Sequence, residues 1–518
     1  MSPDSAIRND ALWIWNSALD AINPSDLIEQ QVKIDSRGIQ MGDFFLTHSQ
    51  YANVLVIGAG KAGAAMAAAL EMVLDGNLPA GKSLYGQVNV PEGYQSTTRH
   101  IKLVPCRPPA VNLPNDRVVE ATSRLLHLMQ TANQDDLVVA LISGGGSALL
   151  EKPVPTINLN TLIETTKRVA DAGADIGQLN AIRSRLSQVK SGGLVRHCRN
   201  RYLVSLILSD VIGDSLTTIA SGPTVLPDDP LASASLNVLN DLGIDPGLLS
   251  PAVIDALIQR PATLSVIPQI HPIILGNNQT AVTAACEAAR KLGYRTELEI
   301  VGDVHSSAPP YVPRGETAEA AGRRLARILA KPWKPDSDQP VMDQVEMPHQ
   351  QTLPAVNERW CFISGGEPTV KLPANSGRGG RNQHLILSAI DELMLGIAPS
   401  GEFCLLSGGT DGEDGSTTAA GALFDHLQFK HLCDRISAAT EIDDNRQYEG
   451  FQTAVDESQD GGLSGYSLPS ESITIRMADC LRRFDSGSLL EAWDYLLQTG
   501  ATHTNVCDLR ILLKRKSN

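Results

Sequence analysis

The sequence lacks the features of membrane and secreted proteins. A helix that spans a bilayer needs about 18 to 20 consecutive apolar residues, and the sequence contains no such run. Met1 to Asn23 shows no basic segment followed by an apolar one, and Asp4 and Asp10 argue against a basic transit helix. We therefore expect a cytoplasmic protein with no membrane partner.

The chain also lacks an excess of basic residues. It has 43 Lys and Arg against 58 Asp and Glu, a formal net charge of −15. This charge excludes the broad positive field that nucleic-acid partners require, so an anionic ligand must be held by local cations. The eight cysteines form no CxxC pair, and no histidine pair lies nearby at zinc spacing. They are predicted to be reduced and mostly buried.

Several well-known catalytic motifs are missing. The sequence has no Walker A motif, no HRD or DFG set of the protein kinases, and no GxSxG elbow. The familiar nucleotide-binding and hydrolase folds that carry these motifs are therefore disfavoured.

The pattern of apolar residues predicts an α/β protein with two domains. A chain of 518 residues exceeds the roughly 250 to 300 that one hydrophobic core supports. Short runs of Val, Ile and Leu alternate with helical segments, as in βαβ units. The expected strands of the first unit are Asn53–Ile57, Asp136–Ile142 and Leu203–Leu208, and those of the second are Pro272–Leu275, Leu298–Val301, Trp360–Ile363 and Phe403–Leu406. The break is placed in Asp228–Pro251, which gives domains 1–250 and 251–518.

Two polar tracts interrupt the second half. Lys331–Glu358 holds five prolines among acidic and amide residues, which predicts a mobile insertion or linker at 331–358. Glu441–Ser470 is rich in Asp, Gln, Ser and Gly, and is expected to form a long loop or a lid at 441–470.

Four strands are followed by glycine-rich turns of one design. The turns are Gly58–Gly63, Ser143–Ser147, Ser364–Glu367 and Ser407–Gly412. Glycine allows consecutive N–H groups to point toward one anion, and a following helix adds partial positive charge. One such turn can reflect geometry alone, but four favour the binding of phosphate or carboxylate.

The first turn matches GxGxxG and contains Lys61. The match raises a nicotinamide dinucleotide as an alternative ligand, which needs an acid at the end of the second strand. The expected strand Tyr85–Val90 offers Gln87 and Asn89 instead. Lys61, the only charge in its turn, is either simply solvated or, as we favour, placed to contact a phosphoryl group.

Charged residues follow the third strand and precede it. Asp210 and Asp214 are candidates for accepting a hydroxyl proton or for holding Mg²⁺, although Asp214 also suits the cap of a helix. Arg183, Arg185 and Lys190 form a local basic patch, which either steers an anion or is a solvated helix face.

The second half repeats this chemistry. Arg378 and Arg381 lie in a glycine-rich turn before a helical run, and the fork of arginine suits carboxylate or phosphate. Acids that could ligate Mg²⁺ follow other strands. They are Glu367, Asp411, Glu413 and Asp414, each of which could also be simply solvated.

Taken together, these motifs resemble the glycerate 2-kinases. In the first half the resemblance lies in the lysine turn, in SGGGSALL at Ser143–Leu150, and in LSDVIGD with IASGPT at Leu208–Thr224. In the second half it lies in ISGGEPTV, GRGGRNQH, SGGTDGEDGSTTAAGA and THTNVCDLRILL, which end in the module called MOFRL at about 400–515. It covers nearly the whole chain.

The resemblance implies ATP-dependent phosphorylation of D-glycerate, usually at the 2-hydroxyl, with Mg²⁺ or another divalent cation. It further implies a Rossmann-like first domain with a parallel sheet, a smaller mixed α/β second domain, an active site in the cleft between the domains, and a role in serine, glycerate or fructose breakdown. The hydroxyl that reacts and the oligomeric state are left open.

The family pattern also assigns roles to residues of this sequence. Lys61 and Arg381 would bind and polarise the phosphate and glycerate groups, Asp210 would be the base, and Asp210 and Asp411 would be the metal candidates. The residues expected to bind substrate or ATP are Gly58, Gly60, Ser143, Gly144, Gly145, Gly146, Ser147, Asp214, Glu367, Asn382 and Asp411.

The sequence departs from the common microbial pattern at Val104–Pro114, where a Gly-His-Pro turn is expected, so it is closer to the animal-type members. Substrate contacts near Asn112 are therefore open. Two alternatives remain, a nicotinamide dehydrogenase and a non-catalytic sugar-phosphate or nucleotide-binding regulatory module. A regulatory module that only binds its ligand would not need so many charged residues in its turns as this sequence has, namely Lys61, Asp210, Arg381 and Asp411.

Overall fold

The computed structural model describes residues 5–94, 96–108, 113–226, 233–259, 267–299, 315–331, 359–373, 375–396, 399–446 and 470–516. The chain forms two compact units. The N-terminal unit comprises Leu19–Ala281 and Ala501–Cys507, and the C-terminal unit comprises Met1–Ala18, Val282–Gly500 and Asp508–Asn518.

The N-terminal unit is built on a six-stranded sheet with the order β6-β5-β4-β7-β8-β9. The strands are β4 (Val54–Ala59), β5 (Leu84–Pro91), β6 (Ile101–Arg107), β7 (Leu137–Ser143), β8 (Tyr202–Leu208) and β9 (Gln269–Gly276). All neighbouring pairs are parallel. In chain order this is the 3-2-1-4-5-6 arrangement of dinucleotide-binding folds, so the prediction of a Rossmann-like parallel sheet is confirmed.

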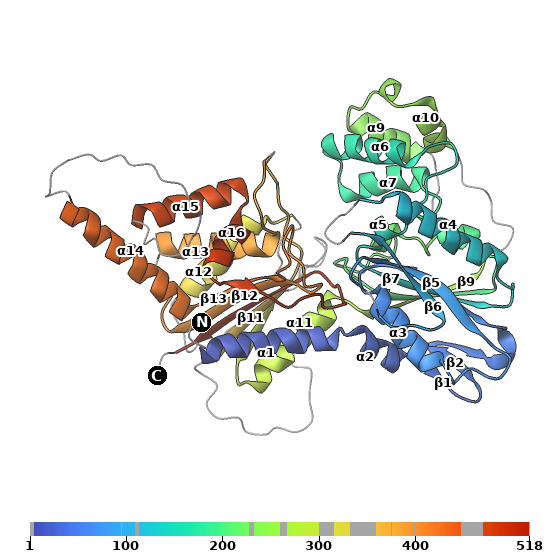
Figure 1. The fold of residues 1–518 in the computed structure, drawn as a ribbon, viewed down its shortest axis with the longest axis horizontal. Helices are drawn as coiled ribbons and strands as arrows, with labels where there is room; N and C mark the ends of the chain where they lie inside the picture. The colour runs from blue at the N-terminus through green and yellow to red at the C-terminus, as the bar shows by residue number, and fades with distance from the viewer. Residues whose placement is uncertain are drawn as a thin grey trace, which may run out of the picture. The chain divides into compact units, whose positions relative to one another are not determined.

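Helices cover both faces of this sheet, which explains why its strands are continuous apolar runs. Leu55 and Ile57 of β4 pack with Leu125 of α4 (Asp116–Thr131) in one cluster. The alternate residues of β4 face the other side, where α3 (Gly63–Leu74) contacts the sheet. Figure 1 shows α3 and α4 on opposite faces.

Smaller elements complete the N-terminal unit. They are α2 (Pro24–Gln31), the antiparallel strands β1 (Val32–Ile34), β2 (Gly38–Met41) and β3 (Phe44–Thr47), the short helices η1 (His48–Gln50), α5 (Gly146–Leu149), α8 (Gly193–His197), η2 (Ile219–Ser221) and η3 (Pro246–Leu248), and the helices α6 (Leu159–Asp171), α7 (Ile176–Leu186), α9 (Ser233–Asp241) and α10 (Pro251–Ile258). The last four helices share a hydrophobic cluster of their own, and Figure 1 shows them grouped at one end of the unit.

The C-terminal unit has a mixed sheet with the order β10-β11-β15-β12-β13-β14. The strands are β10 (Arg295–Glu299), β11 (Arg359–Gly366), β12 (Glu402–Gly409), β13 (Gly421–Asp425), β14 (Leu496–Leu497) and β15 (Asp508–Arg515). Among the described strands of this sheet, only β10 and β11 pair in parallel, and the last strand, β15, lies antiparallel between β11 and β12. The predicted mixed α/β architecture is confirmed.

Helices also cover both faces of the mixed sheet. On one face lie α12 (Ala318–Ala330), α13 (Arg381–Leu395), α14 (His426–Arg446), α15 (Ser470–Arg483) and α16 (Ser486–Ala492). On the other lie α1 (Ala6–Ala21) and α11 (Asn278–Lys291), as Figure 1 shows. The buried ring of Trp15 reaches Gly408 of β12, where a β-carbon would lie 2.8 Å from the indole.

The structure revises two expectations about how the chain is divided. The strand predicted at Pro272–Leu275 was assigned to the second domain, and this is wrong, because β9 pairs with β8 and completes the parallel sheet. The compact units differ from the predicted 1–250 and 251–518, since α10 and β9 stay with the N-terminal unit and Met1–Ala18 groups with the C-terminal unit. The expected break at Asp228–Pro251 falls among α9 and η3.

Other predictions fall partly outside the described residues. Of the expected insertion at 331–358, residues 332–358 lie outside, as does Asn112. Of the tract at 441–470, residues 447–469 lie outside, while its first residues end α14. The eight cysteines are free thiols, and all but Cys433 are buried. Among the described helices, none has both the length and the hydrophobicity needed to cross a bilayer.

Candidate active site

Two predicted glycine turns of the N-terminal unit lie side by side at the point where the strand order reverses. The β4 and β7 strands are neighbours, so the turns that follow them meet at the same edge of the sheet. The hydroxyl of Ser143 is fully buried and accepts a hydrogen bond from Ala62 N at 3.1 Å. A β-carbon on Gly60 would collide with Ser143 Oγ, which explains the glycine. Ligands of open α/β sheets bind at this edge.

Lys61 lies against the second turn. Its backbone N donates to Gly144 O at 2.8 Å. Its Cγ and Cε atoms lie 3.2 and 3.7 Å from where a β-carbon of Gly145 would be, and Arg107 Nη2 lies 3.8 Å from the same point. Gly145 has a φ of +75°, which favours glycine. Two cations therefore approach the turn at Gly145.

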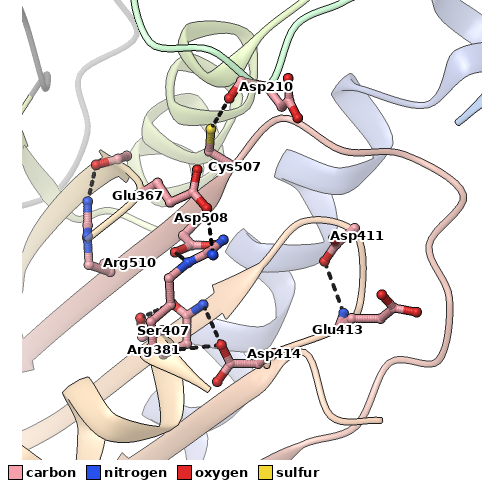
Figure 2. Close-up of polar contacts among 12 residues, drawn as sticks. Asp210, Glu367, Arg381, Ser407, Asp411, Glu413, Asp414, Cys507, Asp508 and Arg510 are labelled. Carbon is pink, nitrogen blue, oxygen red and sulfur yellow. Dashed lines mark hydrogen bonds and ion pairs between the residues drawn. The ribbon is translucent and has the colours of Figure 1, made fainter. Parts of the chain in front are cut away.

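Asp210 follows β8 and contacts a segment near the C-terminus of the chain. Asn505 Nδ2 donates to Asp210 Oδ2 at 3.4 Å, and Cys507 Sγ donates to Asp210 O at 2.7 Å. A β-carbon on Gly144 would collide with both the Asp210 carboxylate and the Asn505 amide, so these groups lie directly beside the turn. The Cys507 contact with Asp210 is drawn in Figure 2.

The sequence analysis did not single out Asn505 or Cys507. Their segment is held in the N-terminal unit by two further hydrogen bonds, from Thr504 Oγ1 to Ile22 O at 2.9 Å and from Asn278 Nδ2 to Val506 O at 2.8 Å. The available signal was the polar stretch THTNVCD before an apolar strand, which was used only for the resemblance.

Asp214 does not cap a helix, so that interpretation is wrong. Its φ of +52° lies in the left-handed region, and its Oδ2 accepts a hydrogen bond from Asn277 Nδ2 at 2.5 Å. The residue lies in a turn, and the next helical element, η2, begins at Ile219 with Thr218 as its cap. Asp214 therefore ties the turn after β8 to the turn after β9.

The three residues of the predicted basic patch, Arg183, Arg185 and Lys190, do not all contact the same part of the structure. Arg183 Nη2 donates to Ser147 Oγ at 2.9 Å, and Lys190 Nζ donates to Ser147 O at 2.7 Å. Burial lowers the pKa of Lys190 to about 8, although the carboxylate of Glu151 at 3.3 Å opposes this shift. Arg185 contacts Gln259 O instead, at 3.4 Å. Two of the three cations thus serve the Ser143–Ser147 turn.

Gln87 and Asn89, which stand where a dinucleotide-binding protein needs an acid, are buried in the structure. Gln87 Nε2 donates to Asn89 Oδ1 at 2.9 Å and to Ala121 O at 2.8 Å, and both side chains are buried. An acid, Glu92, does follow β5 directly, but its carboxylate pairs with Arg117. A ribose-binding acid is therefore not provided within β5.

A second cluster forms in the C-terminal unit around Asp508 (Figure 2). As the first residue of β15, Asp508 is in register with Gly366 at the end of β11 and with Gly409 at the end of β12. Its carboxylate accepts from Arg381 Nε at 2.5 Å and from Arg381 Nη2 at 2.8 Å. Arg381 Nη1 also pairs with Glu367 at 2.6 Å. The sequence analysis missed Asp508.

The turn before α13 is fixed by Asp414. This buried carboxylate accepts from Asn382 N at 3.1 Å and from Gln383 N at 2.8 Å, which satisfies the free N–H groups of the helix start. Burial raises the pKa of Asp414 to about 7, although its hydrogen bond from Gln383 opposes the shift. Asn382 Oδ1 accepts from Ser407 Oγ at 2.6 Å and is buried, so it joins α13 to β12.

Asp411 lies in the turn after β12. Its Oδ1 accepts from Glu413 N at 3.0 Å. A β-carbon on Gly409 would lie 3.1 Å from Asp411 Oδ1 and 3.5 Å from Asp508 Oδ1, so two carboxylates approach one point. No group of three or more metal-ligating side chains occurs among the described residues.

The structure therefore brings the predicted site residues together in two sets. In the N-terminal unit, Lys61 and Asp210 each lie in contact range of the turn Gly144–Ser147. In the C-terminal unit, Arg381 pairs with Glu367, and Asp411 approaches the Asp508 that Arg381 also binds. Gly58, one residue before the end of β4, lies beside Leu141, which leaves no room for a side chain there.

The buried position of His384, which follows the arginine turn, predicts that the stability of the fold decreases at low pH. Burial lowers its pKa from 6.5 to about 4, and its ring stacks on Phe484 at 4.4 Å. Between pH 6.5 and 4, the unfolded chain binds a proton at this residue that the folded chain does not. The contribution of neutral His384 to the free energy of unfolding is therefore complete above pH 6.5 and is lost as the pH falls through 4. We expect a loss of roughly 2 to 3 kcal/mol from this residue.

The measurement is urea unfolding of the wild type and of His384→Leu between pH 4 and 7. In His384→Leu, the free energy of unfolding should fall less steeply with decreasing pH than in the wild type. His431→Leu changes an exposed position and should keep the pH dependence of the wild type. An unchanged slope in His384→Leu would show that other groups carry the acid sensitivity.

Comparison with known proteins shows where this arrangement belongs. Residues 10–258 match a family model described as a domain of unknown function, DUF4147, and residues 360–468 match the MOFRL family. Glycerate kinase from Mus musculus is 32% identical over 99% of this chain and 94% of its own length. The chain belongs to the glycerate kinase family. The predicted resemblance and the assignment to the kinases are confirmed.

Members of the glycerate kinase family from distant organisms are also similar. Glycerate 2-kinase from Pyrococcus horikoshii is 29% identical over 86% of this chain and 92% of its own length. The crystal structure of a glycerate kinase from Thermotoga maritima aligns with a TM-score of 0.67 and 26% identity, covering 98% of this chain and 99% of that one. The same fold is therefore used by a solved family member.

Proposed function

We propose that this protein transfers a phosphoryl group from ATP to D-glycerate, with 2-phosphoglycerate as the product. The observation that carries the proposal is the placement of Lys61 beside Gly145 and of Asp210 beside Gly144, at the switch point of the parallel sheet. A cation for phosphate and a carboxylate for a hydroxyl proton are the two groups that alcohol phosphorylation requires.

Lys61 stabilises the charge that develops on the transferred phosphoryl group. The Lys61 side chain lies along Gly145, and its backbone N–H is hydrogen-bonded to Gly144 O. The turn at Gly58–Gly63 and the turn at Ser143–Ser147 supply N–H groups for the phosphates of ATP. A preorganised cation of this kind acts without reorganisation during the reaction.

Asp210 accepts the proton of the glycerate hydroxyl as that oxygen attacks. The amide of Asn505 donates to Oδ2, and the thiol of Cys507 holds the backbone of Asp210. These contacts orient the carboxylate toward its proposed task. In the C-terminal unit, Arg381, ordered by Asp508 and Glu367, is proposed to bind an anionic group of the substrates.

The residues present fit a magnesium ion. Mg²⁺ is bound by one or two carboxylates together with phosphate oxygens and water, rather than by an all-protein cage. Asp210 offers a carboxylate beside the Asn505 amide, and Asp411 with Asp508 offers two carboxylates near Gly409. Either Asp210 or Asp411 would hold it, and the ion would neutralise charge on the phosphates of ATP.

The choice of the 2-hydroxyl rests on the similarity to a relative named glycerate 2-kinase. The proposed setting is the cytoplasm, in the breakdown of serine, glycerate or fructose. Two functional halves remain our proposal, with the boundary moved past β9 because that strand belongs to the sheet of the first.

The test is ADP release by purified protein with ATP and Mg²⁺, with and without D-glycerate, with the product identified by NMR. We expect ADP release only with glycerate, and a phosphoester signal on C2. A signal on C3 would correct the regiochemistry. Folded protein that binds ATP and does not turn over would favour a regulatory module instead.

A further inference from the structure

Two cationic side chains of the N-terminal unit converge on the hydroxyl of Ser147. Arg183 Nη2 donates to Ser147 Oγ at 2.9 Å, and Lys190 Nζ lies 3.1 Å from the same oxygen. Ser221 Oγ is 2.9 Å from it as well. This cluster lies on the turn that the proposed function assigns to ATP.

The two cations differ in how their charge is balanced. Lys190 is 1% exposed and pairs with Glu151, whose other oxygen accepts from Ser187 Oγ at 2.5 Å. Arg183 makes no direct ion pair among the described residues, although the charge of Glu151 also favours its cationic form, and its Nε has no hydrogen-bond partner there. The side chain is only partly exposed, and its buried Nε lacks a compensating hydrogen bond until an anion binds.

The charge around the turn identifies the kind of anion. Lys61 and Arg107 lie close to Gly145, and Arg183 and Lys190 lie at Ser147. Glu151 pairs with Lys190, and the carboxylate of Asp210 lies beside Gly144. In a chain with a net charge of −15, such a local excess suits a polyphosphate better than the single carboxylate of glycerate.

We propose that Arg183 binds a phosphate group of ATP and that Lys190 is a positioning residue that fixes Ser147 beside it. Lys190 is too buried to reach a ligand, and its bonds to both Ser147 O and Ser147 Oγ hold the end of the turn. Arg183 is partly exposed and keeps donors for phosphate oxygens. The inference rests on the proposed kinase function.

The experiment measures the Kd for ATP by calorimetry without glycerate, and then the KM values for ATP and for glycerate. Arg183→Gln should raise the Kd and KM for ATP by about 10-fold to 100-fold, as expected for loss of a charge-assisted hydrogen bond. The KM for glycerate should change by less than about twofold. Arg183→Lys keeps the positive charge but loses the forked guanidinium, so its Kd for ATP should lie between those of the wild type and Arg183→Gln.

Arg185→Gln is the matched control, because this arginine is on the same helix but contacts Gln259. It should bind ATP as the wild type does. Unchanged ATP affinity in folded Arg183→Gln, an effect on the glycerate KM alone, or an equal loss in Arg185→Gln would overturn the inference. Should Arg183→Gln fail to fold, wild-type affinity in Arg183→Lys would overturn it.

These outcomes are separable from the proposed function. If the wild type binds ATP but does not phosphorylate glycerate, the function is wrong, and the Kd comparison still decides the role of Arg183. If the wild type phosphorylates glycerate and Arg183→Gln keeps its ATP affinity, only the inference about Arg183 is wrong. Wild-type protein that does not bind ATP overturns both.

Discussion

Lys61→Ala should lower kcat for glycerate phosphorylation by at least about a hundredfold while leaving the protein folded. The side chain runs along Gly145 and is partly exposed, so its truncation leaves no cavity in the hydrophobic core. Removing one preorganised donor to a developing oxyanion typically costs a factor of about 100 to 1,000 in rate. The effect should appear in kcat more than in KM, since the extra charge develops in the transition state.

The matched control is Lys167→Ala, which removes an exposed lysine of α6 in the same unit and should keep wild-type kcat. Steady-state kinetics of the two variants, with thermal unfolding to verify the fold, make the comparison. Near-normal turnover in folded Lys61→Ala would remove this residue from the mechanism and would leave Arg107, the other cation near Gly145, as the candidate.

The site in the N-terminal unit could be predicted from the sequence to a large extent. Each of its turns follows a continuous apolar run, and such runs form buried parallel strands. The carboxyl ends of those strands must then lie at one edge, which brings Lys61 beside Gly144 and Ser143. Local composition and strand direction were sufficient for this result.

The partners of these residues could not be predicted in the same way. Asn505 meets Asp210 across 295 positions of sequence, and Asp508 meets Arg381 across 127. Both contacts depend on where the last strand is inserted. A strand pattern shows that β15 exists, but not that it lies antiparallel between β11 and β12. For the same reason β9 was assigned to the wrong sheet.

Arg381→Ala should lower both the activity and the stability of the protein. The carboxylate of Asp508 is fully buried and takes two hydrogen bonds from Arg381, so the variant leaves a buried charge without its partner. Breaking a buried pair in this way costs about 3 to 5 kcal/mol. Because the Arg381 side chain is 31% exposed, we expect roughly 2 to 4 kcal/mol here.

The double variant Arg381→Ala with Asp508→Asn separates the two effects. A neutral amide is far less costly to bury than an unpaired carboxylate, so part of the lost stability should return. The activity should not return, because the proposed contact of Arg381 with substrate is still missing. Urea unfolding and steady-state kinetics on the same preparations measure both quantities.

Arg378→Ala provides the control from the same turn. Its pair with Glu491 is exposed on both sides, at 46% and 51%, and pairs of this kind contribute at most about 1 kcal/mol. This variant should therefore be nearly wild type in both measurements. Recovery of kcat together with stability in the double variant would mean that Arg381 acts only by neutralising Asp508, and the proposal that it binds substrate would have to be abandoned.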